Sequence, residues 1–144
     1  MNNKPINRRR DLLPLWIKFF TWIYLIFGVS GLILLVIGLF FNEVNLSIYG
    51  IASDRIYSTY GILIIVLFIF NGIIAYGLWC EKDWGPKLGI IGAIIGIGIC
   101  SYIMLIIPFL YGSRNFTIRI ELIILIPYLL KLQKLQKIWL RIKQ

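Results

Sequence analysis

Residues 59–110 read TYGILIIVLFIFNGIIAYGLWC-EKDWGPK-LGIIGAIIGIGICSYIMLIIPFL, and this stretch decides the fold. It contains two long apolar segments, residues 59–80 and 88–110, joined by a short charged turn at residues 81–87. Neither apolar segment contains Asp, Glu, Lys or Arg. Because a helix needs roughly 17–25 apolar residues to cross a bilayer, each segment predicts a transmembrane helix. A turn this short joins antiparallel neighbours in a bundle.

A further apolar segment lies on each side of this hairpin of helices. Residues 15–41 follow the basic run Arg8-Arg9-Arg10 but are too long for a signal peptide and lack a cleavage site, so we expect a retained first span. The last segment is weaker, because its charge-free stretch, residues 122–130, is too short to cross about 30 Å of hydrocarbon. Residues 118–138 suffice if the lysines reach back to the inner surface.

The predicted fold is therefore all-α: a polytopic membrane protein in which a four-transmembrane-helix bundle ends in a basic amphipathic C-terminal helix. We expect one membrane domain over residues 1–144, with the outer loop partly lying against the interface because it carries Leu46, Ile48 and Tyr49. The predicted order is cytoplasmic residues 1–14, span 15–41, outer loop 42–58, span 59–80, inner turn 81–87, span 88–110, outer turn 111–117, span 118–138 and cytoplasmic tail 139–144.

The composition agrees with lipid as the solvent of the chain. Hydrophobic residues make up 60% of the 144 residues and charged residues 15%, whereas soluble domains carry roughly 45–50% and 25%. The net charge of +9 comes with no nucleic-acid recognition motif, so we expect no nucleic-acid partner. Positive-inside topology and attraction to anionic lipids of the inner leaflet explain the charge instead.

Counting Lys and Arg predicts the orientation of the four spans. Twelve of these residues fall on the side that holds the N-terminus, the turn at residues 81–87 and the tail. The opposite side holds only Arg55, Arg114 and Arg119. We therefore expect a multi-pass protein of the inner membrane with both termini in the cytoplasm.

The chain beyond Leu130 is amphipathic at helical spacing. Apolar residues fall on one face: Leu132, Leu135, Ile138, Trp139 and Ile142. The basic residues Lys131, Lys134, Lys137 and Arg141 lie apart from that face. This pattern is typical of a helix in the inner-leaflet interface, so the basic residues are candidates for binding anionic lipid or a partner.

Small residues form a stripe along the third predicted span. Gly85, Gly89, Gly92, Gly96 and Cys100 follow one another at intervals of four, three, four and four residues. Small residues let helix backbones approach closely in lipid, where apolar burial drives little association. The stripe fits internal packing of the bundle, and it also fits a homodimer or partner interface. The first span adds two further helix-packing candidates, Gly28 and Gly31.

Asn71 is the one strongly polar side chain deep in the second span. At 1.5 Å per residue it lies roughly 18 Å from the outer end, and Ser30 and Ser101 reach similar depths on the neighbouring spans. We expect an interhelical hydrogen bond between Asn71 and one of these serines. The functional alternative is a contact to a substrate or ion along a polar track.

The sequence contains few residues that could serve in catalysis or metal binding. Histidine is absent, Cys80 and Cys100 form no CxxC motif, and neither paired carboxylates nor a nucleophile with its base appears. We therefore expect two free thiols, no metal site, no cofactor and no catalysis.

The stretches Tyr76-Gly77-Leu78-Trp79 and Lys82-Asp83-Trp84-Gly85-Pro86-Lys87-Leu88-Gly89 carry a resemblance. "GLW" closes one helix, "K-x-WG" makes the turn and a Gly-rich helix follows. This resembles the central hairpin of small uncharacterised four-helix bacterial inner-membrane proteins, and it extends over residues 76–89 alone. The resemblance implies the four-helix architecture and no activity.

Abundant packing residues with little chemistry favour a membrane interaction protein. It would be an accessory or assembly subunit, or a self-associating helical bundle, so its partners would be a membrane protein or further copies of the chain. One alternative is a small transporter or channel with a polar track at Asn71. Another is a membrane-active toxin or immunity factor, which the basic amphipathic tail suggests.

Overall fold

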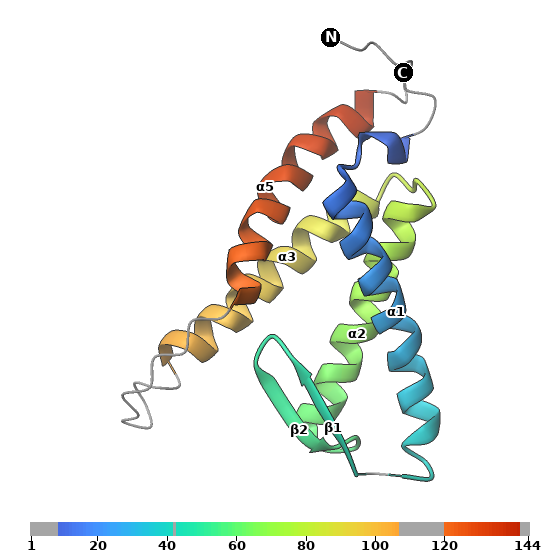
Figure 1. The fold of residues 1–144 in the computed structure, drawn as a ribbon, viewed down its shortest axis with the longest axis vertical. Coiled ribbons are helices and arrows are strands. Elements are labelled where there is room, and N and C mark those ends of the chain that lie inside the picture. The colour runs from blue at the N-terminus through green and yellow to red at the C-terminus, as the bar shows by residue number, and fades with distance from the viewer. Residues whose placement is uncertain (1–8, 42, 107–119, 142–144) are drawn as a thin grey trace.

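The computed structural model describes residues 9–41, 43–106 and 120–141. Within them the chain is mostly helical (Figure 1). The elements in chain order are the short 3₁₀ helix η1 (Arg9–Leu12), α1 (Leu15–Ile37), strands β1 (Glu43–Ile48) and β2 (Ile51–Arg55), α2 (Thr59–Trp79), α3 (Gly85–Ser101), the π-helical turn η2 (Tyr102–Ile106) and α5 (Ile120–Arg141).

Three helices are long and apolar enough to cross a membrane. They are α1, α2 and the continuous segment formed by α3 and η2, which match the first three predicted spans. This confirms a helical protein with several candidate membrane spans. The fourth long helix, α5, is not apolar enough to qualify, because four of its last eleven residues are Lys or Arg.

Helices α1 and α2 pack together at one very close crossing. A Cβ built on Gly28 of α1 would lie 2.5 Å from the Cα of Gly72 on α2, so only glycine fits at either position. Aromatic pairs flank the crossing: the rings of Trp22 and Trp79 lie 4.9 Å apart, and Phe27 stacks on Phe68 at 5.1 Å. Close backbone approach with large side chains on both sides is a favourable packing solution in lipid.

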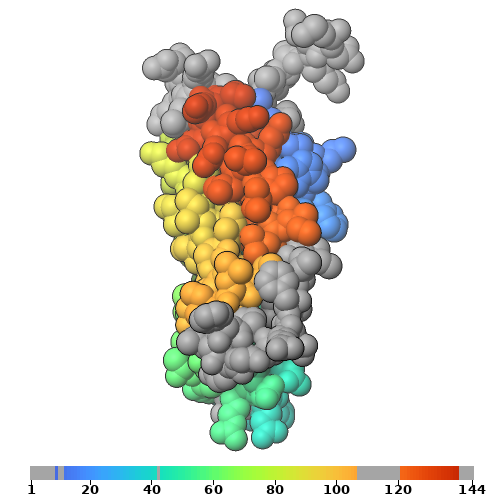
Figure 2. All heavy atoms as spheres, turned by 90° about the vertical axis from the view of Figure 1, so that its left-hand side faces the viewer, coloured from blue at the N-terminus to red at the C-terminus, as the bar shows by residue number. Residues whose placement is uncertain are grey.

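Helix α3 packs against α2 on one side and α5 on the other, and Figure 2 shows α5 lying along α3. The buried side of α3 is its row of small residues. Gly85 meets the backbone of Gly77, while Gly92 contacts the side chain of Ile74. Pro86 at the start of α3 fixes a helical φ where no hydrogen-bond donor is needed, so the turn passes directly into the helix.

The amphipathic face of α5 is covered by protein. Leu132, Leu135 and Trp139 are 0–3% exposed and form one cluster with residues such as Leu13 and Ile17 at the start of the chain. The prediction that this face lies in the inner-leaflet interface is therefore wrong for these three residues. Burying them against α1 and α3 removes the same apolar surface from water, and it also fills the bundle. Ile138 alone of the described apolar set stays exposed.

The predicted outer loop contains a β-hairpin, which the all-α prediction missed. Strands β1 and β2 pair antiparallel, and Ile48 lies opposite Ile51 across a two-residue turn. Both turn residues have positive φ, 52° at Tyr49 and 90° at Gly50, as a type I′ turn requires. Apolar residues on the strands pack on α2: Leu46 and the following Ile56 are buried beside Ile64 and Ile65.

The contact of Gly28 with Gly72 gives the first prediction. Gly28→Ala places a methyl group against the α2 backbone, so the helices must separate. We expect the free energy of unfolding in detergent to fall by about 1–3 kcal/mol, as overpacked cores do. The matched control is Gly98→Ala, because a Cβ at Gly98 meets nothing within 4 Å. Equal stability of the two variants, measured by circular dichroism during denaturation, would contradict the close crossing.

Candidate functional site

The turn of the hairpin is inserted between the helices. In Figure 1 it points into the space between α2 and α3. Tyr49 at the turn is only 7% exposed, and its ring packs on Gly96 of α3, where a built Cβ would lie 3.1 Å from the tyrosine Cζ. The Cys100 thiol donates to the Tyr49 carbonyl at 3.7 Å. The insertion is possible because α3 presents small residues at this level.

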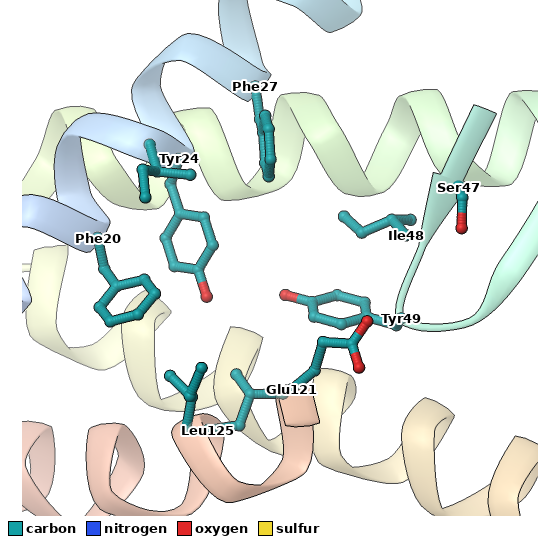
Figure 3. Close-up of a pocket in the computed structure, with 10 residues that line it drawn as sticks. Phe20, Tyr24, Phe27, Ser47, Ile48, Tyr49, Glu121 and Leu125 are labelled. Carbon is teal, nitrogen blue, oxygen red and sulfur yellow. The ribbon is translucent and has the colours of Figure 1, made fainter. Parts of the chain in front are cut away.

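The hydroxyl of Tyr49 meets Asn71 inside the bundle. It lies 3.2 Å from the amide nitrogen, which donates to it, and 3.4 Å from the amide oxygen. Burial raises the pKa of the Tyr49 hydroxyl, so the group stays protonated and remains able to donate. Tyr24 of α1 adds a second hydroxyl that hydrogen bonds with Tyr49, and the two hydroxyls point towards each other in Figure 3. Asn71 is thus held by a polar cluster rather than by one bond.

Two of the polar residues predicted on the spans do not join this cluster. Ser30 and Ser101 are half-buried, and among the hydrogen bonds of the described residues Asn71 pairs with Tyr49 instead. The predicted serine partners are therefore wrong. The reason is the hairpin. Its turn brings the long side chain of Tyr49 to the amide of Asn71, with which the short serine side chains on the neighbouring helices form no hydrogen bond among the described residues.

Tyr128 of α5 completes the buried polar set. Its ring makes edge contacts with Trp16 and Tyr24, at 6.4 Å and 6.2 Å. The residue is 3% exposed, and its hydroxyl has no hydrogen-bond partner within the described part of the chain. The hydroxyl is directed at Gly89, 3.7 Å from a Cβ built there. A small hollow lined by Tyr24, Tyr49, Asn71 and Tyr128 lies beside it.

A larger cavity of about 280 Å³ opens beside the polar cluster. Helix α1 supplies aromatic rings to it, the hairpin supplies its turn, and α5 supplies one carboxylate (Figure 3). The lining residues are Phe20, Ile23, Tyr24, Phe27, Ser47, Ile48, Tyr49, Glu121, Ile124 and Leu125. Such a mixture of rings with a few polar groups is typical of a small-molecule site.

A second hollow, of about 310 Å³, lies on another side of α1. We call it the α1–α2 groove. Its floor is the Gly28–Gly72 crossing, and its walls are apolar side chains that face outward from both helices. The lining residues are Leu25, Gly28, Val29, Leu32, Ile69, Gly72, Ile73 and Tyr76.

The predicted helix-packing glycines all face other parts of the chain. Gly89 lies against Leu132 and Ile74, and Gly31 lies against Phe68 and Ile69. Gly28, Gly85, Gly92 and Gly96 have the contacts given above. The glycine stripe of α3 is thus occupied within the bundle.

The three lysines of α5 lie on its exposed side. Lys131, Lys134 and Lys137 are exposed, while the side chain of Arg141 falls outside the described residues. Near them Arg9 links three segments: it forms an ion pair with Asp83 at 2.6 Å, donates to the Glu81 carbonyl at 3.4 Å and lies over the Trp139 ring at 5.9 Å. This group, the Arg9 clamp, joins the N-terminal segment, the turn before α3 and the end of α5.

Sequence reasoning did not find Tyr24, Tyr49 or Tyr128. Each is an aromatic residue in an apolar surrounding, and such residues also occur at membrane interfaces. The Tyr49-Gly50 turn within the alternating pattern Val44, Leu46, Ile48 was the available signal for the hairpin. The described residues contain no group of three or more Cys, Asp or Glu that could hold a metal ion. The cluster's hydroxyls and amide can bind and orient a ligand.

No protein-family model, curated protein or solved structure matches this chain.

The Tyr49–Asn71 pair gives the second prediction. Removing the hydroxyl by Tyr49→Phe leaves a buried amide without its partner, and Asn71→Leu removes the amide as well. A double-mutant cycle on unfolding in detergent should give a coupling energy of about 0.6–1.7 kcal/mol, the range for hydrogen bonds between membrane helices. Tyr60→Phe, at a residue 63% exposed, should be additive with Asn71→Leu. Additivity in both cycles would contradict the hydrogen bond.

Proposed function

We propose that the protein is a non-catalytic interaction protein of the bacterial inner membrane, with four transmembrane helices and both termini in the cytoplasm. It binds a helix of a second membrane protein in the α1–α2 groove. The observation that carries this proposal is the groove itself: an open apolar hollow whose floor is two glycines and which faces away from the bundle.

The four-span topology is supported by the positions of the charges. The Arg9 clamp gathers η1, the turn before α3 and the end of α5 at one end of the molecule (Figure 1). Twelve of the fifteen Lys and Arg residues belong to these segments and their neighbours, so this end would face the cytoplasm. Helix α5 crosses as the fourth span by burying Leu125 and Tyr128 on the bundle side and letting its lysines reach the inner surface.

The native cysteines allow a test of this topology. Cys80 is exposed at the end of α2, whereas Cys100 is buried beneath Tyr49. A membrane-impermeant maleimide should label Cys80 in inside-out vesicles and not in intact spheroplasts. Asp54→Cys in a Cys80→Ser background, on the exposed strand β2, should give the reverse pattern. Labelling of Cys80 from outside would overturn the cytoplasmic placement of both termini.

We infer the kind of partner from the apolar lining of the groove. Its walls are apolar, and it contains no charged side chain. Between helices in lipid, association depends on close packing, so a helix that places a large apolar side chain over Gly28 and Gly72 would gain many contacts. The stripe of α3 cannot serve this role, because its glycines are covered by α2, α5 and the hairpin.

Filling the groove tests the proposal. We expect the tagged wild-type protein, taken from its native membrane in mild detergent, to retain one other polypeptide in fixed ratio. Val29→Trp should release it, because the indole would occupy the groove; Val29 is 50% exposed, so the fold should tolerate the change. Ile94→Trp on α3, at a residue 55% exposed, is the matched control and should retain the partner.

The same experiment separates the outcomes. A second copy of the chain as the groove-dependent partner would make the protein a self-associating bundle, which is the other form of this proposal. A wild-type protein that purifies as a lone monomer, or a partner that Val29→Trp and Ile94→Trp retain equally, would overturn the groove as an interface.

A second candidate function is that of a small transporter. The cluster of Tyr24, Tyr49, Asn71 and Tyr128 favours it, because these polar groups lie next to a cavity large enough for a small molecule. The apolar face of the C-terminal helix packs on the bundle, so this helix offers no observation in favour of a membrane-active toxin or immunity factor.

A further inference from the structure

The 280 Å³ cavity combines aromatic rings with a single carboxylate. Phe20, Tyr24 and Phe27 line it from α1, Tyr49 lines it from the hairpin and Glu121 from α5 (Figure 3). We propose that this cavity binds a small organic cation, a substituted ammonium with one apolar group, with Glu121 as its counter-ion. The site lies on a different side of α1 from the α1–α2 groove, so it does not depend on the interaction proposed there.

The cavity exists because two helices separate and the hairpin fills only part of the gap. Towards the inner end, α1 and α5 are in contact through Tyr128, which touches Trp16 and Tyr24. Towards the hairpin the two helices diverge (Figure 1). The hairpin turn closes the far side with Tyr49, and the space left between α1 and α5 is the cavity. A ligand can therefore be surrounded by three elements.

The single charged residue in the lining of the cavity favours a ligand of positive charge. Glu121 is the one charged residue among those that line the cavity, and it forms no ion pair within the described residues. It lies one helical turn outward from Leu125, which packs on Gly96. Gly96 is eleven residues into α3, roughly 16 Å from its inner end, so Glu121 falls in the outer half of the bundle. Glu121 is exposed as well as lining the cavity, so a cation can approach its carboxylate and be attracted by it.

The aromatic rings select the kind of cation. The face of each ring carries negative electrostatic potential, which attracts a cation within about 6 Å and favours soft, weakly hydrated ammonium groups. A divalent metal ion would need about six oxygen ligands, and this lining offers one carboxylate and a few hydroxyls. The apolar residues Ile48, Ile124 and Leu125 provide contacts for an apolar substituent.

Benzyltrimethylammonium is a suitable probe, because it combines a quaternary ammonium with one ring. Its neutral analogue, neopentylbenzene, has the same shape and no charge. Binding is measured by equilibrium dialysis of the full chain in dodecyl maltoside, whose headgroup is uncharged. We expect saturable binding of the cation, at least tenfold tighter than binding of the neutral analogue.

Two variants locate the site. Glu121→Gln should weaken binding of the cation at least tenfold and leave the neutral analogue unchanged. Phe27→Leu, which removes an aromatic ring from the cavity wall, should weaken binding of the cation severalfold. Glu43→Gln is the matched control, because Glu43 is an exposed carboxylate at the base of the hairpin and outside the cavity; it should bind as wild type.

The possible results decide the proposal. Equal binding of the cation and the neutral analogue to the wild-type protein would overturn it, and this comparison holds even if Glu121→Gln fails to fold. Unchanged cation binding in folded Glu121→Gln would overturn it too. Competition by added phosphatidylcholine, but not by phosphatidylglycerol, would support the ammonium site and assign its natural occupant to a lipid headgroup; the absence of competition would support a free cation.

Discussion

An amide buried within an apolar helix bundle needs a hydrogen-bond partner, and in this protein the partner of Asn71 comes from outside the helices. Hydrocarbon offers nothing to Asn71, and an unsatisfied polar group there costs several kcal/mol. Tyr49 supplies the bond from the turn of a β-hairpin. The Tyr49 ring can reach the Asn71 amide only if the hairpin enters the bundle and α3 has a residue without a side chain at position 96. The half of the fold that contains the hairpin is arranged around this contact.

The inserted hairpin explains why the molecule has hollows on two sides of α1. On one side α1 and α5 diverge beyond their contact at Tyr24 and Tyr128, and the hairpin turn fills only part of the gap, which leaves the cavity lined by Glu121. On the other side α1 approaches α2 so closely at Gly28 and Gly72 that a groove remains outside the crossing. The first hollow has one carboxylate and a few hydroxyls in its lining, while the lining of the second is almost entirely apolar. This difference is the basis for proposing a small ligand in the first hollow and another helix in the second.

Much of the helical part of the fold could be predicted from the sequence, because it depends on local composition. Apolar segments of bilayer length predicted α1, α2 and α3, and Lys18 is the one charged residue within those predicted segments. The spacing of Gly85, Gly89, Gly92 and Gly96 predicted that these glycines share one face of α3. The site depends on contacts between residues far apart in the chain. Tyr49 lies 22 residues from Asn71 and 51 from Cys100, and no periodicity reveals such pairs. The amphipathic end of α5 was misplaced because an apolar face fits lipid and protein equally well.

The central claim is that Tyr49 lies inside the bundle, and solid-state NMR of the protein in lipid bilayers tests it without altering any residue. With ¹³C-labelled tyrosine and glycine, the Tyr49 ring should give a through-space correlation with the Cα of Gly96, because a Cβ built on that glycine lies 3.1 Å from the ring. The ring should also be remote from water. A Tyr49 ring that correlates with water or lipid headgroups and with no glycine of α3 would contradict the account, because Asn71 would then lack the partner around which the half of the fold that contains the hairpin is built.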